Sequence, residues 1–297
     1  MAKTALELTN TDKLYWPKEK ITKGELLMYY DAVAPYILPY LKNRPLSLLR
    51  HPNGITKPGF YHKDAGDIAP EWMKIANVKS ESSNKVVHYL VCNNHKSLLF
   101  IANLGCIEMN PWSSTITKPD NPDYIVMDID PSEKNSFDQV IDVALIIKDI
   151  LDKGGMKGYC KTSGSSGIHV YIPVNKKYSY EEGRDFAKII ATLVNEQLPE
   201  FTTLERSLSK RSKKEIYIDY LQNSRGQTLA SVYSARPKPG ATVSCPLDWR
   251  EVKHGLHPSQ FTIKNMISRI KKKGDLFKGV LEKGINIHTA LKKLGAE

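Results

Sequence analysis

The chain has 297 residues, of which 41% are hydrophobic and 25% charged, and this balance predicts a globular protein with one large domain or two small ones. Lysine and arginine outnumber the acidic residues by 43 to 32, and the net charge of +11 fits a phosphate-rich partner, although a merely basic surface would look the same. The four cysteines form no C-x-x-C pair, and no apolar stretch approaches the length of a membrane span. These features argue against a zinc ribbon, a disulfide framework, secretion and membrane insertion, and we expect a cytoplasmic protein.

The first third of the chain is expected to alternate short elements with one long loop. Thr22 and Glu25 have the spacing of a capping box, which predicts that a helix begins there. The loop is rich in glycine, proline, lysine and histidine and carries Phe60 and Tyr61, so we interpret it as functional. In chain order we expect a helix over 26–38 bent near Pro35, a strand at 45–50, the loop over 51–70, a helix over 94–104 and a strand at 106–111.

The remaining two thirds are predicted to alternate strands and amphipathic helices. Ser136 and Gln139 form a second capping box, and Gly154 with Gly155 closes the helix that it begins. We expect a strand at 124–130, a helix over 136–153, strands at 158–162 and 168–174, a helix over 180–197, strands at 215–221 and near 228–233, and a basic helix over 259–273. The mixture predicts an α+β fold in which helices frame the sheets.

Two aspartates, Asp128 and Asp130, stand two residues apart in the predicted strand YIVMDIDP. Because side chains alternate along a strand, both carboxylates leave one face while Met127 and Ile129 point into the core. Like charges this close repel, and desolvation adds to the cost unless a hard divalent metal compensates them. A strand end with two solvated acids would carry the same short pattern.

A third acid, Asp219, lies in the predicted strand EIYIDYL on the same face as Tyr217 and Leu221. Three carboxylates can hold two metal ions, one activating a 3′-hydroxyl and the other clamping a triphosphate for in-line displacement. The pattern therefore favours a metal site and nucleotidyl-transfer chemistry where these strands meet.

The run TSGSSGIHVYIP places glycines and serines between two predicted strands. Such a turn lets the backbone approach an anion and offers it hydroxyl and N–H donors, although a plain tight hairpin would have the same composition. His169 alternates with Ile168 and Val170, so it emerges opposite the apolar face, beside the turn. It can donate a hydrogen bond to a triphosphate there, and a satisfied structural histidine is the alternative.

Seven segments occur in an order that resembles the polymerase domain of bacterial and archaeal ligase D, in the archaeo-eukaryotic primase superfamily, from about Leu6 to Leu291. The segments are TNTDKLYWP, ITKGELLMYYDAVAPYILPYLKNRPLSLLRHPNG, GCIEMNPW, YIVMDIDPS, SGSSGIHVYIP, YIDYLQNSRGQT and YSARPKPGATVSCPLDW. The resemblance implies a primase-polymerase fold with a central, mostly antiparallel sheet flanked by helices. It implies one domain over 1–297, with a subregion at 1–75 for 5′-phosphate and template binding and a catalytic core at 90–297.

The same resemblance implies roles for individual residues. Asp128, Asp130 and Asp219 match the catalytic, metal-binding acids. The nucleotide-binding matches are Ser163, Ser165, His169, Gln222, Arg236 and Lys238. The DNA-binding matches are Lys13 and Lys23 at a 5′-phosphate, Phe60 and Tyr61 on template bases, and Arg50 and Lys63. Compact ammonium charges suit a terminal phosphate and exposed aromatics suit base stacking, whereas solvated lysines and an aromatic loop anchor in the core are the alternatives.

Four positions depart from the family pattern. Ser166 stands where a lysine is common, Asn110 where a histidine is, Lys238 where a second arginine is, and Leu49 where a basic residue is. Lys238 keeps the charge but loses the bidentate fork, so we expect weaker or redistributed triphosphate contacts. The neighbouring basic residues that would take them over are Lys210, Arg211 and Lys213.

The resemblance implies addition of nucleotides, with ribonucleotides favoured over deoxyribonucleotides, to 3′ ends at gaps or breaks in DNA that carry a 5′-phosphate. It implies manganese as the preferred metal with magnesium as the alternative, DNA ligase and the Ku end-binding protein as partners, and a place at the nucleoid. No ligase or nuclease segment is visible, so we expect a stand-alone polymerase or an excised domain.

Three other functions compete with this one. A D-x-D sugar-nucleotide glycosyltransferase would also bind a divalent metal through the aspartates. A non-catalytic DNA-end-binding protein would use the positive net charge, and its acids would merely end the strands. A nuclease would also cluster acidic residues in its active site. The polymerase interpretation requires Asp219 to lie close enough to Asp128 and Asp130 to share a metal centre.

Overall fold

The computed structural model describes residues 6–80 and 84–296, and the chain divides into two compact units. The first unit contains the described residues up to Trp112, together with Thr228–Ser244 and Phe261–Lys272. The second contains Ser113–Gln227, Cys245–Gln260 and the described residues from Lys273 onward. No helix in these described residues is both long and apolar enough to cross a membrane. The mixture of helices and strands confirms the expected α+β class.

The first unit packs a helix pair beside a small antiparallel sheet ordered β4-β3-β7. Its long helix α1 begins at the predicted capping box, because the Thr22 hydroxyl accepts from Glu25 N at 3.2 Å and the Glu25 carboxylate accepts from Thr22 N at 2.8 Å. The elements of this unit are β1 Leu14–Trp16, β2 Ile21–Thr22, α1 Lys23–Leu41, β3 Leu46–Arg50, β4 Phe60–His62, β5 Lys74–Lys79, β6 Val86–Val91, α2 His95–Asn103, β7 Cys106–Pro111 and α5 Met266–Lys273.

Two sequence predictions for this unit need correction. The strand expected near 228–233 does not form, since among these residues only Thr228 pairs, in an isolated bridge with Trp112. Tyr233 adopts a φ of 66°, a left-handed conformation that interrupts an extended run. The basic helix expected over 259–273 begins only at Met266, so α5 is half the predicted length.

The second unit is built on a six-stranded sheet ordered β13-β14-β10-β12-β11-β15. Every pairing is antiparallel except that of β13 with β14, which confirms the mostly antiparallel sheet. The strands and helices of this unit are β8 Ser114–Thr115, β9 Lys118–Pro122, β10 Tyr124–Asp130, α3 Phe137–Lys153, β11 Tyr159–Thr162, β12 Ile168–Pro173, α4 Tyr180–Gln197, β13 Thr202–Thr203, β14 Ile216–Asp219, β15 Pro246–Leu247 and α6 Ile287–Leu294. Its 3₁₀ turns are η1 Leu221–Asn223, η2 Trp249–Glu251, η3 Pro258–Gln260 and η4 Lys278–Leu281.

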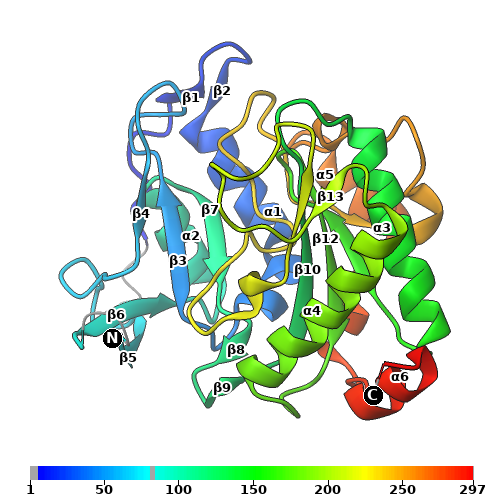
Figure 1. The fold of residues 1–297 in the computed structure, drawn as a ribbon. Coiled ribbons are helices and arrows are strands. Elements are labelled where there is room, and N and C mark those ends of the chain that lie inside the picture. The colour runs from blue at the N-terminus through cyan, green and yellow to red at the C-terminus, as the bar shows by residue number, and fades with distance from the viewer. Residues whose placement is uncertain (1–5, 81–83, 297) are drawn as a thin grey trace. The chain divides into compact units, whose positions relative to one another are not determined.

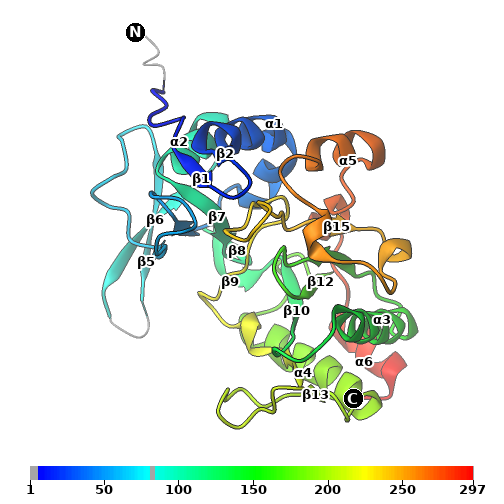
Figure 2. The same cartoon turned by 90° about the horizontal axis from the view of Figure 1, so that it is seen from above.

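Helices α3 and α4 contact each other and cover one face of this sheet (Figure 1, Figure 2). Gly183 on α4 lies so close to Ile125 that an added Cβ would sit 3.2 Å from the Ile125 Cγ1 atom. This contact identifies the helix-covered face as the one that Ile125 shares with Met127 and Ile129. The side chains that alternate with these, those of Asp128 and Asp130, therefore leave the opposite face, as predicted.

Candidate metal and nucleotide site

Strand register places four polar residues in one row across the sheet of the second unit. Asp128 on β10 pairs with Asp219 on β14 and with His169 on β12, and His169 pairs with Lys161 on β11. Residues directly opposite one another in antiparallel strands carry their side chains on the same face. Backbone pairing therefore fixes the order Asp219, Asp128, His169, Lys161 along this row.

The carboxylates of Asp128, Asp130 and Asp219 converge, and one ligand oxygen from each lies within 4.8 Å of the others. Asp128 is buried and Asp130 is exposed at the end of β10. This arrangement confirms the expected convergence of the third acid on the first two. Three carboxylates this close repel one another unless a cation compensates them, and a purely oxygen donor set suits a hard divalent ion. The three residues therefore fit a divalent metal.

Two donors hold the carboxylate of Asp219 in place. The Tyr217 hydroxyl donates to Asp219 Oδ1 at 3.1 Å, and the main-chain N–H of Gln222 donates to the same oxygen at 3.1 Å. Burial, followed by the nearby Asp219 charge, raises the pKa of the Tyr217 phenol, so it stays protonated and remains a donor. The Arg211 guanidinium lies 4.3 Å from the centre of the Tyr217 ring. The Gln222 backbone thus supports a carboxylate, a role that the sequence did not indicate.

A buried asparagine fastens the turn after β14 onto β10. Val126 N donates to Asn223 Oδ1 at 2.8 Å, and Asn223 Nδ2 donates to Val126 O at 2.7 Å. The Asn223 amide thus makes the two hydrogen bonds with the Val126 main chain that a neighbouring strand would otherwise make, and it holds the turn after Asp219 against β10. Sequence reasoning missed this residue, and the only available signal was an asparagine two residues after the predicted strand 215–221.

His169 lies between a carboxylate and a buried lysine. Its Nε2 atom is 3.2 Å from Asp128 Oδ1, and its Nδ1 atom is 2.8 Å from the Lys161 Nζ atom. Lys161 is fully buried, and sequence reasoning missed it. The hairpin pairing could have revealed it, because a turn over 163–167 places residue 161 opposite residue 169.

The Ser-Gly turn is folded by its own first serine. Ser163 Oγ accepts hydrogen bonds from Ser165 N at 3.1 Å and from Gly167 N at 3.0 Å. Gly164 adopts a φ of +71°, which favours glycine, and an added Cβ at Gly167 would lie 2.3 Å from Ile129 O. The turn over 163–167 therefore packs against the end of β10, beside Asp130, and Ser165 is half-buried.

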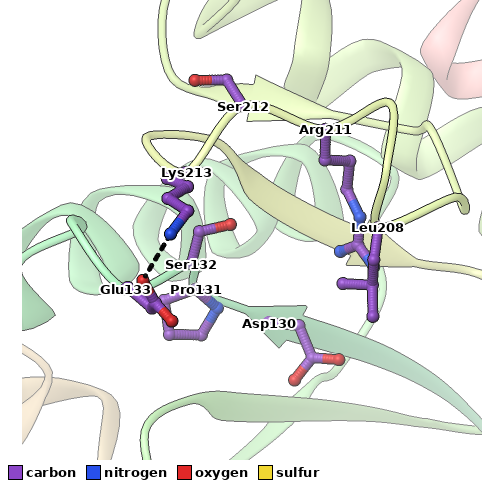
Figure 3. Close-up of a pocket in the computed structure, with 8 residues that line it drawn as sticks. All are labelled: Asp130, Pro131, Ser132, Glu133, Leu208, Arg211, Ser212 and Lys213. Carbon is purple, nitrogen blue, oxygen red and sulfur yellow. Dashed lines mark hydrogen bonds and ion pairs between the residues drawn. The ribbon is translucent and has the colours of Figure 1, made fainter.

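A cavity of about 440 Å³ opens next to Asp130 (Figure 3). Its walls are Asp130, Pro131, Ser132, Glu133, Leu208, Arg211, Ser212 and Lys213. Lys213 reaches Glu133, with its Nζ atom 3.3 Å from Glu133 Oε2, whereas the neighbouring Lys210 is not part of the lining. Of the three basic residues expected to take over phosphate contacts, Arg211 and Lys213 thus share a cavity with a metal-site aspartate.

Arg236 and Lys238 belong to the first unit. Arg236 Nε lies 2.6 Å from Glu108 Oε2, and Glu108 is buried, so the guanidinium is held by a shielded carboxylate. Lys238 is exposed, and its main-chain carbonyl accepts from Trp16 Nε1 at 2.8 Å. The sequence did not indicate that Glu108 would orient Arg236.

Lys13 and Lys23 are brought together in the first unit by the β1–β2 hairpin. Lys13 Nζ donates to Asn53 Oδ1 at 2.5 Å, and Lys23 Nζ donates to Thr9 O at 2.7 Å. Burial lowers the pKa of Lys23, and the Lys13 charge lowers it further. Two ammonium groups that repel each other and contact only uncharged oxygens in these bonds can accept an anion between them.

The predicted aromatic pair is exposed on β4 rather than anchored in the core. Phe60 is 47% exposed and Tyr61 is 62% exposed. The Arg50 side chain lies between Phe60 and the main chain at Leu104. Its Cζ atom is 5.3 Å from the Phe60 ring centre, and its Nε donates to Leu104 O at 2.9 Å. Lys63, one residue past β4, is also exposed. This geometry removes the core-anchor alternative for both aromatics.

Comparison with known proteins yields one consistent family. A family model described as the LigD primase-polymerase domain matches residues 22–277. The bifunctional non-homologous end joining protein LigD of Bacillus subtilis is 36% identical over 270 residues, which cover 91% of this chain and 43% of that protein. The multifunctional non-homologous end joining DNA repair protein LigD of Mycobacterium tuberculosis is 30% identical over 279 residues, which cover 91% of this chain and 36% of that protein. The chain thus spans less than half the length of these relatives.

A solved structure extends the likeness to the fold. The polymerase domain of Mycobacterium tuberculosis ligase D, in complex with DNA, aligns with a TM-score of 0.87 at 28% sequence identity. The alignment covers 95% of this chain and 100% of that chain. The fold that the sequence motifs implied is therefore confirmed.

Proposed function

The chain belongs to the family of LigD primase-polymerase domains, and from that premise we propose that it adds nucleotides to 3′ ends at gaps and breaks in DNA. The observation that carries the proposal is the convergence of three carboxylates, from two adjacent strands, within 4.8 Å. Strand pairing holds Asp128 opposite Asp219, so the cluster does not depend on a mobile loop. The reaction class is nucleotidyl transfer.

Asp128, Asp130 and Asp219 would hold the divalent ions. When bound, two such ions supply activation of the 3′-hydroxyl and neutralisation of charge on the triphosphate. The protein's own part is to keep the acids aligned, and the Tyr217 hydroxyl and the Gln222 main chain do this for Asp219. We propose manganese as the preferred metal and magnesium as the alternative.

In the second unit, the proposed nucleotide contacts are Ser163, Ser165, His169 and Gln222, on or after the Ser-Gly turn and β14. In the first unit, the proposed nucleotide contacts are Arg236 and Lys238. Ser163 acts in part by shaping the turn, because its hydroxyl accepts two main-chain N–H groups. The Arg236 guanidinium is preorganised by Glu108 for planar contacts with phosphate. Ribonucleotide preference over deoxyribonucleotides is part of the proposal.

DNA would be bound by groups of the first unit. The close approach of Lys13 and Lys23 supports their assignment to a terminal 5′-phosphate, which carries more charge than an internal diester. The exposure of Phe60 and Tyr61 supports stacking on template bases, and Arg50 and Lys63 would contact the same strand. Lys13, Lys23, Arg50, Phe60, Tyr61 and Lys63 together form the proposed DNA contacts.

We further propose that the reaction serves end-joining repair at the nucleoid, with a DNA ligase and the Ku end-binding protein as partners. The relatives from Bacillus subtilis and Mycobacterium tuberculosis carry non-homologous end joining in their names. A formal charge of +11 supports an association with DNA.

Primer extension on a gapped duplex with a 5′-phosphate tests the proposal. The wild-type protein is offered each ribonucleotide and deoxyribonucleotide with manganese or magnesium, and products are resolved on a gel. We expect extension that is strongest with ribonucleotides and manganese. Asp128→Ala should abolish extension while binding to the gapped DNA stays within about twofold, because only one acid of a metal site is lost.

The matched control for that variant is Asp149→Ala, which removes an exposed helix acid paired with Lys153. It should extend like the wild type. Retained extension by Asp128→Ala would overturn the catalytic assignment. Hydrolysis of a sugar nucleotide without DNA would support a glycosyltransferase, strand cleavage would support a nuclease, and DNA binding without any product would support an end-binding protein.

A further inference from the structure

Trp72 is a tryptophan that the fold of the first unit leaves exposed. It is 42% exposed, whereas Trp16 and Trp112 of the same unit are buried. Burial is what usually stabilises an aromatic ring of this size, so a ring left in water is available to a ligand with a flat apolar face. A turn before β5 fixes the position of Trp72, because the Met73 N–H donates to Pro70 O at 2.8 Å.

Two residues of α2 hold the Trp72 ring. Lys96 and Phe100 are four residues apart, so their side chains lie on one face of the helix. The Lys96 Nζ atom lies 4.2 Å from the centre of the Trp72 ring, and the Phe100 ring meets that ring nearly at right angles, with the ring centres 5.5 Å apart. Trp72, Lys96 and Phe100 therefore form a compact surface, which we call the Trp72 platform.

The charge of Lys96 on this platform is not neutralised. Within the part of the chain that the structure describes, Lys96 forms no ion pair with an acid. Trp249 in the second unit also has a lysine near its ring, since the Lys148 Nζ atom lies 5.7 Å from the ring centre, but Lys148 is paired with Asp152. The charge of Lys148 is thus neutralised within the protein, whereas that of Lys96 remains available to an anion.

The Trp72 platform combines an exposed aromatic ring with an available cation. This combination binds single-stranded nucleic acid, because every base can stack on the ring and every phosphate can contact the cation. Lys74, the first residue of β5, adds an exposed ammonium group two residues after Trp72. We propose that the platform stacks a base of an unpaired DNA strand on Trp72, with Lys96 and Lys74 on the phosphates of that strand. This contact rests on the DNA binding of the proposed function, and it lies outside the DNA contacts named there.

Two neighbours of the Trp72 ring oppose such a ligand. Lys96 competes with the base for the ring, but a cation–π contact at an exposed site is weaker than base stacking, so the ammonium group can leave the ring for a phosphate. Glu71, the exposed residue before Trp72, repels a phosphate, and the charges of Lys74 and Lys96 outnumber its own. Stacking on Trp72 is therefore favoured over the contacts that it replaces.

Tryptophan fluorescence of the full chain, titrated with oligothymidine in the absence of metal and nucleotide, tests the stack directly. We expect oligothymidine to quench the wild-type fluorescence. Trp72→Phe should lose most of this quenching, while its affinity stays within about threefold of the wild type because a smaller ring still stacks. Trp249→Phe is the matched control, since it removes the other tryptophan with a lysine near its ring, and it should keep the quenching.

Fluorescence anisotropy of labelled oligothymidine measures the affinity. Trp72→Ala should weaken binding by about tenfold, the value of one base stacked on an aromatic ring. Lys96→Gln should weaken binding and lower the slope of its salt dependence by about 0.7, the share of one phosphate in a single strand. Glu71→Gln should strengthen binding. Met28→Ala, which removes another exposed apolar side chain of the same unit, should leave the affinity unchanged.

Wild-type fluorescence that does not change at saturating oligothymidine would overturn the proposal even if every variant failed to fold. An affinity of folded Trp72→Ala equal to that of the wild type would overturn it as well and would leave the platform to a protein partner. If the wild type binds the gapped duplex but not oligothymidine, the platform contact alone is wrong. If it binds neither, the DNA binding of the proposed function is wrong too.

Discussion

Each unit of the molecule contains a cluster of like charges, and the two clusters are held in different ways. The acids Asp128, Asp130 and Asp219 converge within 4.8 Å because strand register sets two of them opposite each other. A short hairpin brings Lys13 and Lys23 together. The Lys13 ammonium group donates to a side-chain amide oxygen and the Lys23 ammonium group to a main-chain carbonyl, and both of these oxygens are uncharged.

The difference matches the ligand that each cluster fits. A small divalent cation needs several oxygens at fixed separations, and a sheet supplies such separations. A terminal phosphate needs charge more than fixed separations, and the proposed pair supplies it with the exposed Lys13 and the buried Lys23. Self-repulsion within each cluster supports the proposal that both bind a ligand of opposite charge.

The largest expected effect comes from neutralising one acid without changing its shape. Asp219→Asn should lower the extension rate by about a hundredfold or more, because a metal ligand contributes several kcal/mol to such a reaction. Steady-state extension with manganese measures it, and the midpoint of thermal unfolding should not fall, since repulsion is relieved. An extension rate within threefold of the wild type would show that Asp128 and Asp130 act without the third acid.

Removal of the lysine pair should break the second cluster. Lys13→Ala with Lys23→Ala should weaken binding to gapped DNA that carries a 5′-phosphate by about tenfold or more, since even one hydrogen bond to a charged group contributes about 1.5–3 kcal/mol. Binding to the same DNA without the phosphate should change much less, and fluorescence anisotropy measures both.

The matched control for the lysine pair is Lys18→Ala with Lys57→Ala, which removes the same charge at exposed positions outside the pair. It should weaken binding to both DNA molecules equally. Equal losses from the Lys13 and Lys23 variant would mean that these lysines are general phosphate contacts.

The third test concerns what holds the acid cluster in register. Asn223→Ala should lower the free energy of unfolding by about 2 kcal/mol, because it leaves both main-chain groups of Val126 buried without their side-chain partner. Denaturant unfolding measures it, with the exposed Gln227→Ala as the control. An unchanged stability would show that water replaces the amide and that the turn after β14 is held elsewhere.

The smallest expected effect tests one hydrogen bond to the acid cluster. Tyr217→Phe removes the hydroxyl that donates to Asp219 but keeps the ring against which Arg211 stacks. We expect manganese affinity to fall about threefold, the value of a single hydrogen bond of about 0.7 kcal/mol. Calorimetric titration measures it, and an unchanged affinity would mean that the Gln222 main chain alone orients Asp219.

Elements with a strong periodic signal were predicted well. The strand Tyr124–Asp130 and the helix Tyr180–Gln197 have the predicted bounds, and capping boxes marked the beginnings of α1 and α3 correctly. The strands β5 and β6 and the helix α6 were missed, because short or polar-interrupted segments lack a repeat long enough to show a period. The false strand near 228–233 had apolar residues of the right kind, but its backbone turns at Tyr233.

Two residues that depart from the family pattern, Asn110 and Ser166, differ in burial and in their contacts. Asn110, which stands where a histidine is common, is buried and donates from Nδ2 to Ser47 O at 3.2 Å, so its amide has a structural use between β7 and β3. Ser166 is exposed at the tip of the turn beside Asp130. Neither outcome is visible in the sequence, because burial depends on which strands become neighbours.

The sequence by itself predicted the fold class and the three acids, because alternation along a strand and the order of motifs can be read directly from it. The roles of the Ser-Gly turn and of Lys13 and Lys23 stay predictions, those of the lysines implied by the family resemblance. The tertiary structure decided which of these groups meet. Only strand order and register place Asp219 and His169 on either side of Asp128 and bury Lys161 behind His169. A shift of one residue would send each side chain to the other face of the sheet, so the site exists through long-range pairing and not through any single segment.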